Sequence, residues 1–282
     1  MNPLALTFPE FADEVFRLTG RKDFHARALY RALFCEGETE FTSNAQWSRY
    51  PREAKLLSRH LLLPNPSQVY SSPDGTVKFV TTLHDGEDIE SVIIREKNRT
   101  TLCISSQAGC AMGCSFCATG QAGFVRNLSV DEIVGQVFSA RFTLDRSIDN
   151  LVFMGMGEPF DNFEEVKKAT RILSHPLGLD KSARRITVST VGKVDKINEL
   201  VKEDPFRLAV SLNATTDEIR SKIMPINLKW KIEELMEACK AYSQRANKRV
   251  TFEYILMKDV SDTMEDAKRL AKLTSQISCK IN

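Results

Sequence analysis

The stretch from Thr101 to Cys117 reads TLCISSQAGCAMGCSFC, a short apolar strand pattern followed by three closely spaced cysteines. Cys110, Cys114 and Cys117 form a C-x3-C-x2-C run. Three thiolates at this spacing can bind three irons of a 4Fe-4S cluster and leave the fourth iron open to a further ligand. A structural zinc site usually takes four protein ligands, and no nearby cysteine or histidine completes such a set. The run therefore favours an iron–sulfur cluster, with zinc or plain buried thiols as the alternatives.

Alternating strand and helix patterns begin at this stretch and continue along the chain. Apolar runs predict five strands, at residues 101–106, 151–154, 186–190, 208–212 and 250–256. Helical periodicity follows each of them, at residues 130–142, 163–173, 193–201, 231–243 and 264–273. Five βα units predict an α/β fold with a parallel sheet, open and doubly wound or curled into a barrel, with functional groups at the carboxyl ends of the strands. Residues 278–282 predict the opening of a sixth strand.

The residues that precede the repeat follow a different pattern. Apolar residues at helical spacing predict helices over 8–16 and 24–34, and we assign residues 1–62 to a small helical N-terminal domain. Strand patterns at 76–83 and 90–94, joined by a turn-rich segment, predict a short antiparallel β connector over 63–97. Residues 98–282 then hold the βα repeat.

The overall composition is that of an ordinary globular chain. Its 282 residues carry 39 Lys and Arg against 37 Asp and Glu, a net charge of +2. The chain has no run of about 18 apolar residues, and its first residues lack the charged and apolar regions of an export signal, so we expect a cytoplasmic enzyme with no membrane partner. The seven cysteines favour metal binding or thiol chemistry over a disulfide framework in such a chain.

Two groups of basic residues are candidates for contact with a polyanion. The groups are Arg95, Lys97, Arg99 and Arg126 around the cysteine run, and Lys181, Arg184 and Arg185 before the third predicted strand of the repeat. Such clusters can contact the phosphates of a nucleic acid. The alternative is that they are solvated surface charges, which is the commoner role of basic residues.

The cysteine spacing, with Phe116 before the last thiol and a βα repeat after it, resembles the radical SAM superfamily. A narrower resemblance, to the RlmN/Cfr family of RNA adenosine methyltransferases, rests on several blocks in the same order. These blocks are TLCISSQAGC at 101–110, CATGQAGFVRNL at 117–128, GMGEP at 155–159, RITVST at 185–190 and LAVSLNA at 208–214. The resemblance implies a partial (β/α)6 radical SAM barrel, incomplete at its sixth strand, with the helical N-terminal domain as an RNA-binding module.

The resemblance also implies a cofactor role for each matching residue. Cys110, Cys114 and Cys117 would hold the cluster, whose open iron takes the amino and carboxylate groups of S-adenosyl-L-methionine (SAM). Gly157 and Glu158 match the contact with the methionine amino group. The other matching cofactor-contact positions are Ser189, Ser211, Leu212, Asn213 and Asn282.

Two further matches imply catalytic roles. In the family, the deoxyadenosyl radical takes hydrogen from a methyl group carried by a cysteine near the C-terminus, and the resulting carbon radical adds to adenine. Cys103 matches the cysteine that resolves the protein–RNA adduct by forming a disulfide with the methyl-carrying cysteine. Glu90 aligns with the proton acceptor. Without the resemblance, a core thiol and a solvated strand carboxylate are the ordinary interpretations.

Substrate and partners follow from the same resemblance. It implies methylation of C2 of an adenosine in 23S rRNA and possibly in tRNA, with Cfr-like C8 methylation as the alternative, by a monomer that receives electrons from a donor such as flavodoxin. Family members continue for several tens of residues past the position matching Asn282 and carry the methyl-carrying cysteine there. We therefore expect a C-terminally truncated chain that binds the cluster and SAM without completing methylation. A radical SAM enzyme with another substrate and a non-catalytic remnant are the other hypotheses.

Overall fold

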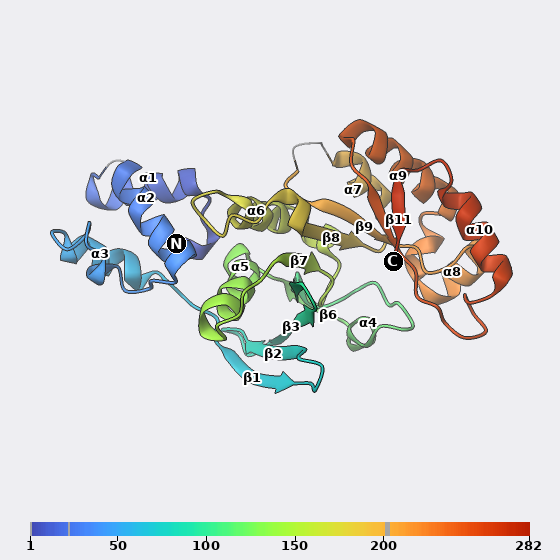
Figure 1. The fold of residues 1–282 in the computed structure, drawn as a ribbon, viewed down its shortest axis with the longest axis horizontal. Helices are drawn as coiled ribbons and strands as arrows, with labels where there is room; N and C mark the ends of the chain where they lie inside the picture. The colour runs from blue at the N-terminus through green and yellow to red at the C-terminus, as the bar shows by residue number, and fades with distance from the viewer. Residues whose placement is uncertain (1, 22, 201–203) are drawn as a thin grey trace.

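One mixed sheet runs through the molecule. The computed structural model describes residues 2–21, 23–200 and 204–282. Nine strands pair in the order β1-β2-β3-β4-β7-β8-β9-β10-β11. Each strand therefore pairs with the strands of this sheet that come before and after it in the sequence. The N-terminal helices lie at one end of the molecule and the C-terminal helices at the other, with the sheet between them (Figure 1).

The first part of the sheet is antiparallel. Its strands are β1 (Pro66–Ser71), β2 (Val77–Thr82), β3 (Asp88–Glu96) and β4 (Arg99–Cys103). The predicted strands at 76–83 and 90–94 are confirmed, but β1 was not expected, because its side chains are almost all exposed and show no apolar alternation. The predicted connector is not separate from the main sheet, since β3 pairs with β4 along five residues.

The second part of the sheet is parallel. The strands β4, β7 (Asn150–Phe153), β8 (Ile186–Thr190), β9 (Arg207–Ser211), β10 (Val250–Glu253) and β11 (Cys279–Ile281) pair in parallel. All six predicted strands are confirmed. The first ends at Cys103 and the fifth at Glu253, each three residues earlier than predicted. Beyond β4, the Ile104 N–H still donates to the Val152 carbonyl of β7. The sheet thereby brings the ends of successive parallel strands to one edge.

Helices follow the parallel strands as the periodicity predicts. These helices are α5 (Val130–Phe138), α6 (Phe163–Ser174), α7 (Val194–Glu199), α9 (Ile232–Ala246) and α10 (Met264–Thr274). The last position of the predicted helix 193–201, Val201, lies outside the described residues. The short helix α8 (Asp217–Ile223) was not predicted, because its seven residues are too few to show helical periodicity.

Three helices form the N-terminal part, α1 (Phe8–Thr19), α2 (Asp23–Arg31) and α3 (Pro51–Arg59). A capping box of Thr7 and Glu10 starts α1, and Gly20 ends it in the left-handed conformation. Residues of these helices and of the sheet belong to one continuous apolar core. Short π segments, η2 (Ala32–Glu36) and η4 (Ser139–Thr143), continue α2 and α5, so the predicted helices 24–34 and 130–142 change their hydrogen bonding near their ends.

A second, two-stranded sheet frames the cysteine run. It pairs β5 (Gln107–Gly109) with β6 (Phe124–Asn127), and the short helix α4 (Ala118–Ala122) lies between them. Gly109 adopts φ +74°, and a Cβ there would lie 2.0 Å from the Gly123 carbonyl oxygen. Only glycine therefore allows the two ends of this loop to approach so closely.

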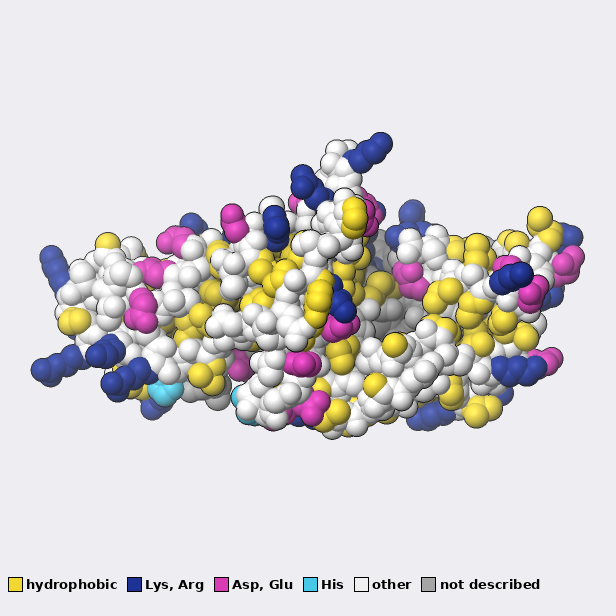
Figure 2. Space-filling view, turned by 90° about the horizontal axis from the view of Figure 1, so that it is seen from below, with side chains coloured by type: hydrophobic (Ala, Val, Ile, Leu, Met, Phe, Trp, Pro, Cys, Tyr) yellow, Lys and Arg dark blue, Asp and Glu magenta, His cyan; other side chains and the backbone are white. Residues whose placement is uncertain are grey.

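The remaining short segments are 3₁₀ turns. They are η1 (Pro3–Ala5), η3 (Phe41–Ser43), η5 (Pro159–Asn162), η6 (Ala183–Arg185) and η7 (Pro225–Leu228). Among the described residues, no helix is long and apolar enough to cross a membrane. On the face drawn in Figure 2, basic and acidic side chains are interspersed along the length of the molecule.

Candidate functional site

A cavity of about 310 Å³ opens at the carboxyl ends of the parallel strands. The cysteine loop forms one wall, and the segments that follow β7, β8, β9 and β10 form the others. Its polar and thiol lining includes Cys110, Cys114, Cys117, Glu158, Ser189, Ser211, Asn213 and Glu253. Most of the predicted site residues are therefore brought together here from four separate stretches of the chain.

The three thiols face this cavity from one loop. Cys110 and Cys114 are buried and Cys117 is half-buried. Burial raises the pKa of Cys110, and it raises the pKa of Cys114 to about 12. Since a metal or cluster binds the thiolate, loading this site must release protons.

The arrangement of the thiols fits a cluster better than a single ion. Within the described part of the chain, no three His, Cys, Asp or Glu side chains converge to hold one metal ion. Zinc would require four ligands close around a single centre. In a 4Fe-4S cluster each thiolate binds a different iron, so the thiols need only surround a common space. Cys110, Cys114 and Cys117 all line this one cavity.

Glu158 lies in the Gly-Met-Gly-Glu-Pro loop after β7 and is 2% exposed. Gly157 precedes it with φ +99°, and a Cβ at Gly157 would lie 2.5 Å from the Cβ of Gln107. The Glu158 carboxylate accepts the backbone N–H of Phe160 at 3.0 Å and that of Val191 at 2.8 Å. Burial raises the pKa of Glu158 to about 7, against the lowering effect of these hydrogen bonds. A cation in the cavity would favour the ionised carboxylate.

The ends of β8 and β9 contribute hydroxyl and amide groups. Ser189 and Ser211 line the cavity. Asn213 adopts the left-handed conformation with φ 56°, and its Oδ1 accepts the N–H of Ile255 at 3.1 Å. Leu212 is fully buried in the core, so it can reach a ligand only through its backbone. At the end of β9, the cavity-lining residues Ser211 and Asn213 therefore flank the core residue Leu212.

Asn282 lies beside the cavity without lining it. Its side-chain amide donates to Glu253 Oε2 at 2.8 Å, and Glu253 itself lines the cavity. The Asn282 backbone continues the parallel pairing, since its N–H donates to the Phe252 carbonyl at 2.9 Å. The structure therefore places this predicted residue one hydrogen bond away from the cavity wall.

The two predicted catalytic residues lie outside the cavity lining. Cys103 is half-buried at the end of β4, and burial raises the pKa of its thiol to about 11. Glu90 is exposed on β3 and forms an ion pair with Lys78 at 2.7 Å. Its backbone carbonyl accepts the Ser105 hydroxyl, which in turn accepts the N–H of Met156 in the loop of Glu158. Their catalytic roles remain predictions.

Acidic partners occupy part of the first predicted basic group. Arg126 donates to Asp85 at 2.5 Å and to Glu132 at 2.8 Å, which ties the turn before β3 to α5. Arg99 pairs with Glu96. These carboxylates therefore neutralise part of the positive charge that the first group would present to a polyanion.

Arg220 of α8 is a site residue that sequence reasoning missed. Its side chain is fully buried, and burial lowers the pKa of its guanidinium to about 10, so it stays charged at neutral pH. It donates to the Val191 carbonyl at 2.7 Å, the Ser211 carbonyl at 3.0 Å and the Leu212 carbonyl at 3.1 Å. It also donates to Asn227 Oδ1 at 3.0 Å. One side chain therefore joins the ends of β8 and β9 behind the cavity.

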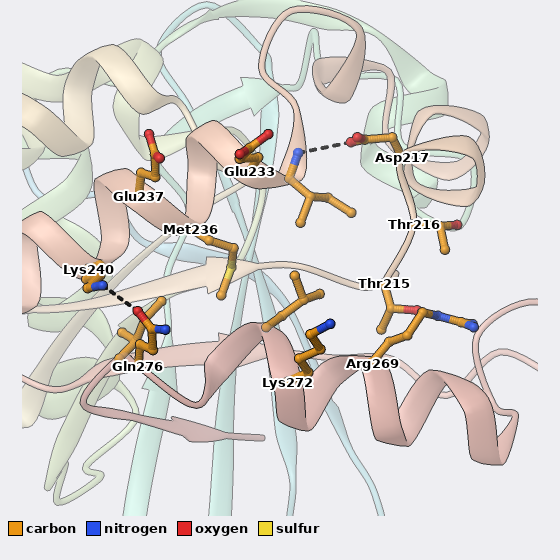
Figure 3. Close-up of a pocket in the computed structure, with 13 residues that line it drawn as sticks. Thr215, Thr216, Asp217, Glu233, Met236, Glu237, Lys240, Arg269, Lys272 and Gln276 are labelled. Atoms are coloured by element: carbon orange, nitrogen blue, oxygen red, sulfur yellow. Dashed lines mark hydrogen bonds between the residues drawn. The ribbon is translucent and has the colours of Figure 1, made fainter.

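A larger hollow of about 650 Å³ lies between α9 and α10 (Figure 3). Glu233 and Glu237 of α9 line it on one side, and Arg269 and Lys272 of α10 line it on the other. Lys240 is bound to Gln276, and Asp217 accepts the N–H of Ile232. Its lining holds no thiol, so the chemistry expected from the cysteine run belongs to the smaller cavity.

Comparison with known proteins agrees with this assignment. The family model of the radical SAM superfamily matches residues 104–271. The dual-specificity RNA methyltransferase RlmN of Syntrophotalea carbinolica is 46% identical over 264 residues, which cover 93% of this chain and 71% of that protein. The protein of the same name from Syntrophobacter fumaroxidans is 42% identical and matches 100% of this chain and 84% of its own length. The chain belongs to the RlmN family of radical SAM methyltransferases.

A solved structure shares the whole fold with this RlmN family member. The crystal structure of a radical SAM methyltransferase from Sphaerobacter thermophilus superposes with a TM-score of 0.91 at 38% identity, over 100% of this chain and 84% of that one. The expected radical SAM α/β fold is thereby confirmed. As a radical SAM methyltransferase, the chain uses a 4Fe-4S cluster and SAM. The cavity lined by the three thiols is the candidate site for the cluster and SAM.

Proposed function

We propose that this cavity binds the cluster and SAM and that the protein methylates adenosine in RNA, by way of a methyl-carrying cysteine that none of residues 1–282 matches. The observation that carries the proposal is the meeting of the three thiols with the buried carboxylate of Glu158 across one cavity. Cys110, Cys114 and Cys117 would hold three irons, and Glu158 would pair with the methionine ammonium. The six parallel strands would form the partial (β/α)6 barrel that supports this site.

The remaining lining residues position SAM and shield it. Held by the three thiols, a 4Fe-4S cluster would supply the electron for cleavage of the SAM sulfonium. Ser189, Ser211 and Asn213 present hydroxyl and amide groups that can bind the polar atoms of SAM, with the Leu212 backbone and Asn282 supporting them from the side. Phe116, Met154 and Ile255 line the cavity and are partly exposed, so their apolar side chains can keep water from its opening.

RNA is the substrate class that the relatives support, because they are named RNA methyltransferases. We infer that the target is C2 of an adenosine in 23S rRNA, and possibly in tRNA, with residues 1–62 as an additional RNA contact. Cys103 would resolve the adduct and Glu90 would accept the proton. The raised pKa of Cys103 means that its thiol must lose a proton before it attacks. Flavodoxin would suit as the electron donor.

Separate analysis of the two products tests this proposal. The anaerobically reconstituted protein would be reduced in the presence of SAM and of 23S rRNA or tRNA fragments, and the digested RNA examined by mass spectrometry. We expect 5′-deoxyadenosine from residues 1–282, and 2-methyladenosine as well when the methyl-carrying cysteine of the family is supplied with them. The 8-methyl isomer would support the Cfr-like alternative. Deoxyadenosine without either methylated base would limit the chain to SAM cleavage.

The affinity for SAM should depend on pH through Glu158. Its pKa of about 7 in the free protein means that the carboxylate is mostly protonated at pH 6 and mostly ionised at pH 8. Because only the ionised form pairs with an ammonium, we expect the Kd for SAM to fall about tenfold from pH 6 to pH 8. Isothermal titration of the reconstituted protein measures this. Glu158→Gln should bind weakly at both pH values, and an unchanged pH slope in that variant would assign the effect to another group.

A further inference from the structure

A second concave surface lies at the opposite edge of the sheet from the cavity. It encloses about 660 Å³ at the amino ends of β8, β9, β10 and β11. Four of its lining residues are basic and exposed, and they come from four separate segments. They are Arg184 in η6, Arg207 at the start of β9, Arg249 just before β10 and Lys280 in β11. We call this surface the basic groove.

The charge of the basic groove is not compensated by its own lining. No acidic side chain lines it among the described residues. In the described part of the chain, Arg184, Arg207, Arg249 and Lys280 form no ion pair, whereas Arg126 and Arg99 elsewhere are paired with carboxylates. A fifth lining cation, Lys248, donates to the carbonyls of Asp204 and Phe206. Several like charges in one concave surface raise the local positive potential and favour an anionic ligand.

The spacing of these cations suits an extended anion. The four segments follow the strand order β8-β9-β10-β11, so the charges form a row across neighbouring strands. Strands lie about 4.8 Å apart, so the row extends over about 15 Å. A single phosphate can contact only part of such a row. Each strand of a duplex carries one charge about every 3.4 Å of the helix axis, so a nucleic-acid backbone has enough phosphates to contact all of it.

We propose that the basic groove binds the phosphate backbone of RNA, as a second contact away from the reacting nucleotide. The strands between the groove and the cavity are about five residues long, so the two sites lie about 15 Å or more apart along the sheet. The groove therefore holds a different part of the RNA from the part that enters the cavity. This inference rests on the proposed function only in taking RNA as the ligand.

A matched pair of double variants tests the proposal in the reconstituted protein. Arg207→Gln with Arg249→Gln removes two groove charges. Lys231→Gln with Lys268→Gln removes two exposed charges outside the groove, one just before α9 and one on α10, and neither lysine forms an ion pair within the described residues. Binding of a fluorescein-labelled single-stranded RNA of about 20 nucleotides would be measured by anisotropy at several salt concentrations. Circular dichroism melts confirm that both variants stay folded.

The groove variant should bind RNA about 25-fold more weakly at 0.1 M salt than the unchanged protein. Its slope of log K against log salt should be smaller by about 1.4, because each lost phosphate contact on a single strand removes about 0.7. The control pair should change neither value appreciably. Equal losses in both pairs, or an unchanged slope in the groove variant, would overturn the proposal. Full competition by millimolar inorganic phosphate would overturn it too, since it would show a small-anion site.

Failure of the groove and failure of the proposed function give different results. If the groove is not an RNA contact, the two double variants bind RNA equally while deoxyadenosine formation persists. If RNA methylation is not the function, the groove variant still loses RNA affinity and slope, while no methylated base is formed even when the methyl-carrying cysteine of the family is supplied. Neither Arg207 nor Arg249 lines the cavity. SAM cleavage without RNA should therefore be the same in the unchanged protein and in both double variants.

Discussion

Replacing Cys114 with alanine is expected to abolish SAM cleavage. The thiol is buried in the cavity wall between two others, and no other cysteine of the described chain lines that cavity to replace it. Iron content after reconstitution should fall well below four per chain, and reductive formation of 5′-deoxyadenosine should drop about 100-fold or more. Iron analysis and chromatography of the nucleoside measure the two effects.

Cys35→Ala is the matched control for this prediction. Cys35 is half-buried, and its Sγ donates to the Gly178 carbonyl at 3.2 Å, outside the cavity. The variant also has six thiols but should keep its iron and its activity. A Cys114→Ala protein that still binds four irons and forms deoxyadenosine would show that the cluster is held elsewhere.

Replacing Arg220 with methionine is expected to cost about 3–5 kcal/mol of unfolding free energy. The change removes every donor of a fully buried guanidinium and leaves the carbonyls of Val191, Ser211 and Leu212 without that partner. Because Val191 and Ser211 line the cavity, the affinity for SAM should fall as well. Urea unfolding and SAM titration measure the two losses.

Two variants separate the geometry of Arg220 from its charge. Arg220→Lys keeps a positive charge but cannot reach all four acceptors at once, so it should recover only part of the stability. Arg245→Met removes an exposed guanidinium that also donates to several carbonyls, including that of Leu200 at 2.9 Å, and should cost about 1 kcal/mol. Full recovery by lysine would contradict the role given to the planar donor group.

The parallel strands could be predicted because their signal is local. Runs such as residues 208–210 are buried and continuously apolar, so the sequence marks them without knowledge of their neighbours. The cysteine run could be predicted for a similar reason, since its spacing lies within one loop, whereas the polar residues at the strand ends were indicated by the family resemblance. The strand β1 gave no such signal, because its exposed side chains have no apolar face.

The unpredicted features depend on contacts between distant segments. An arginine in a helix is ordinarily exposed, and nothing near Arg220 in the sequence shows that its side chain turns inward toward two strand ends. The junction of the antiparallel strands with the parallel sheet depends on pairing between β3 and β4. The basic groove likewise exists only because Arg184, Arg207, Arg249 and Lys280 are brought together by the strand order.

The central claim is that one cavity at the carboxyl ends of the strands holds both the cluster and SAM. Formation of 5′-deoxyadenosine by the anaerobically reconstituted, reduced protein tests it most directly. Glu158→Gln is the variant to compare, because it changes the residue that would pair with SAM and leaves the three thiols in place. The account predicts deoxyadenosine from the unchanged protein, and a large loss in Glu158→Gln with the iron content preserved. A protein with four irons per chain that binds SAM but releases no deoxyadenosine on reduction would contradict it.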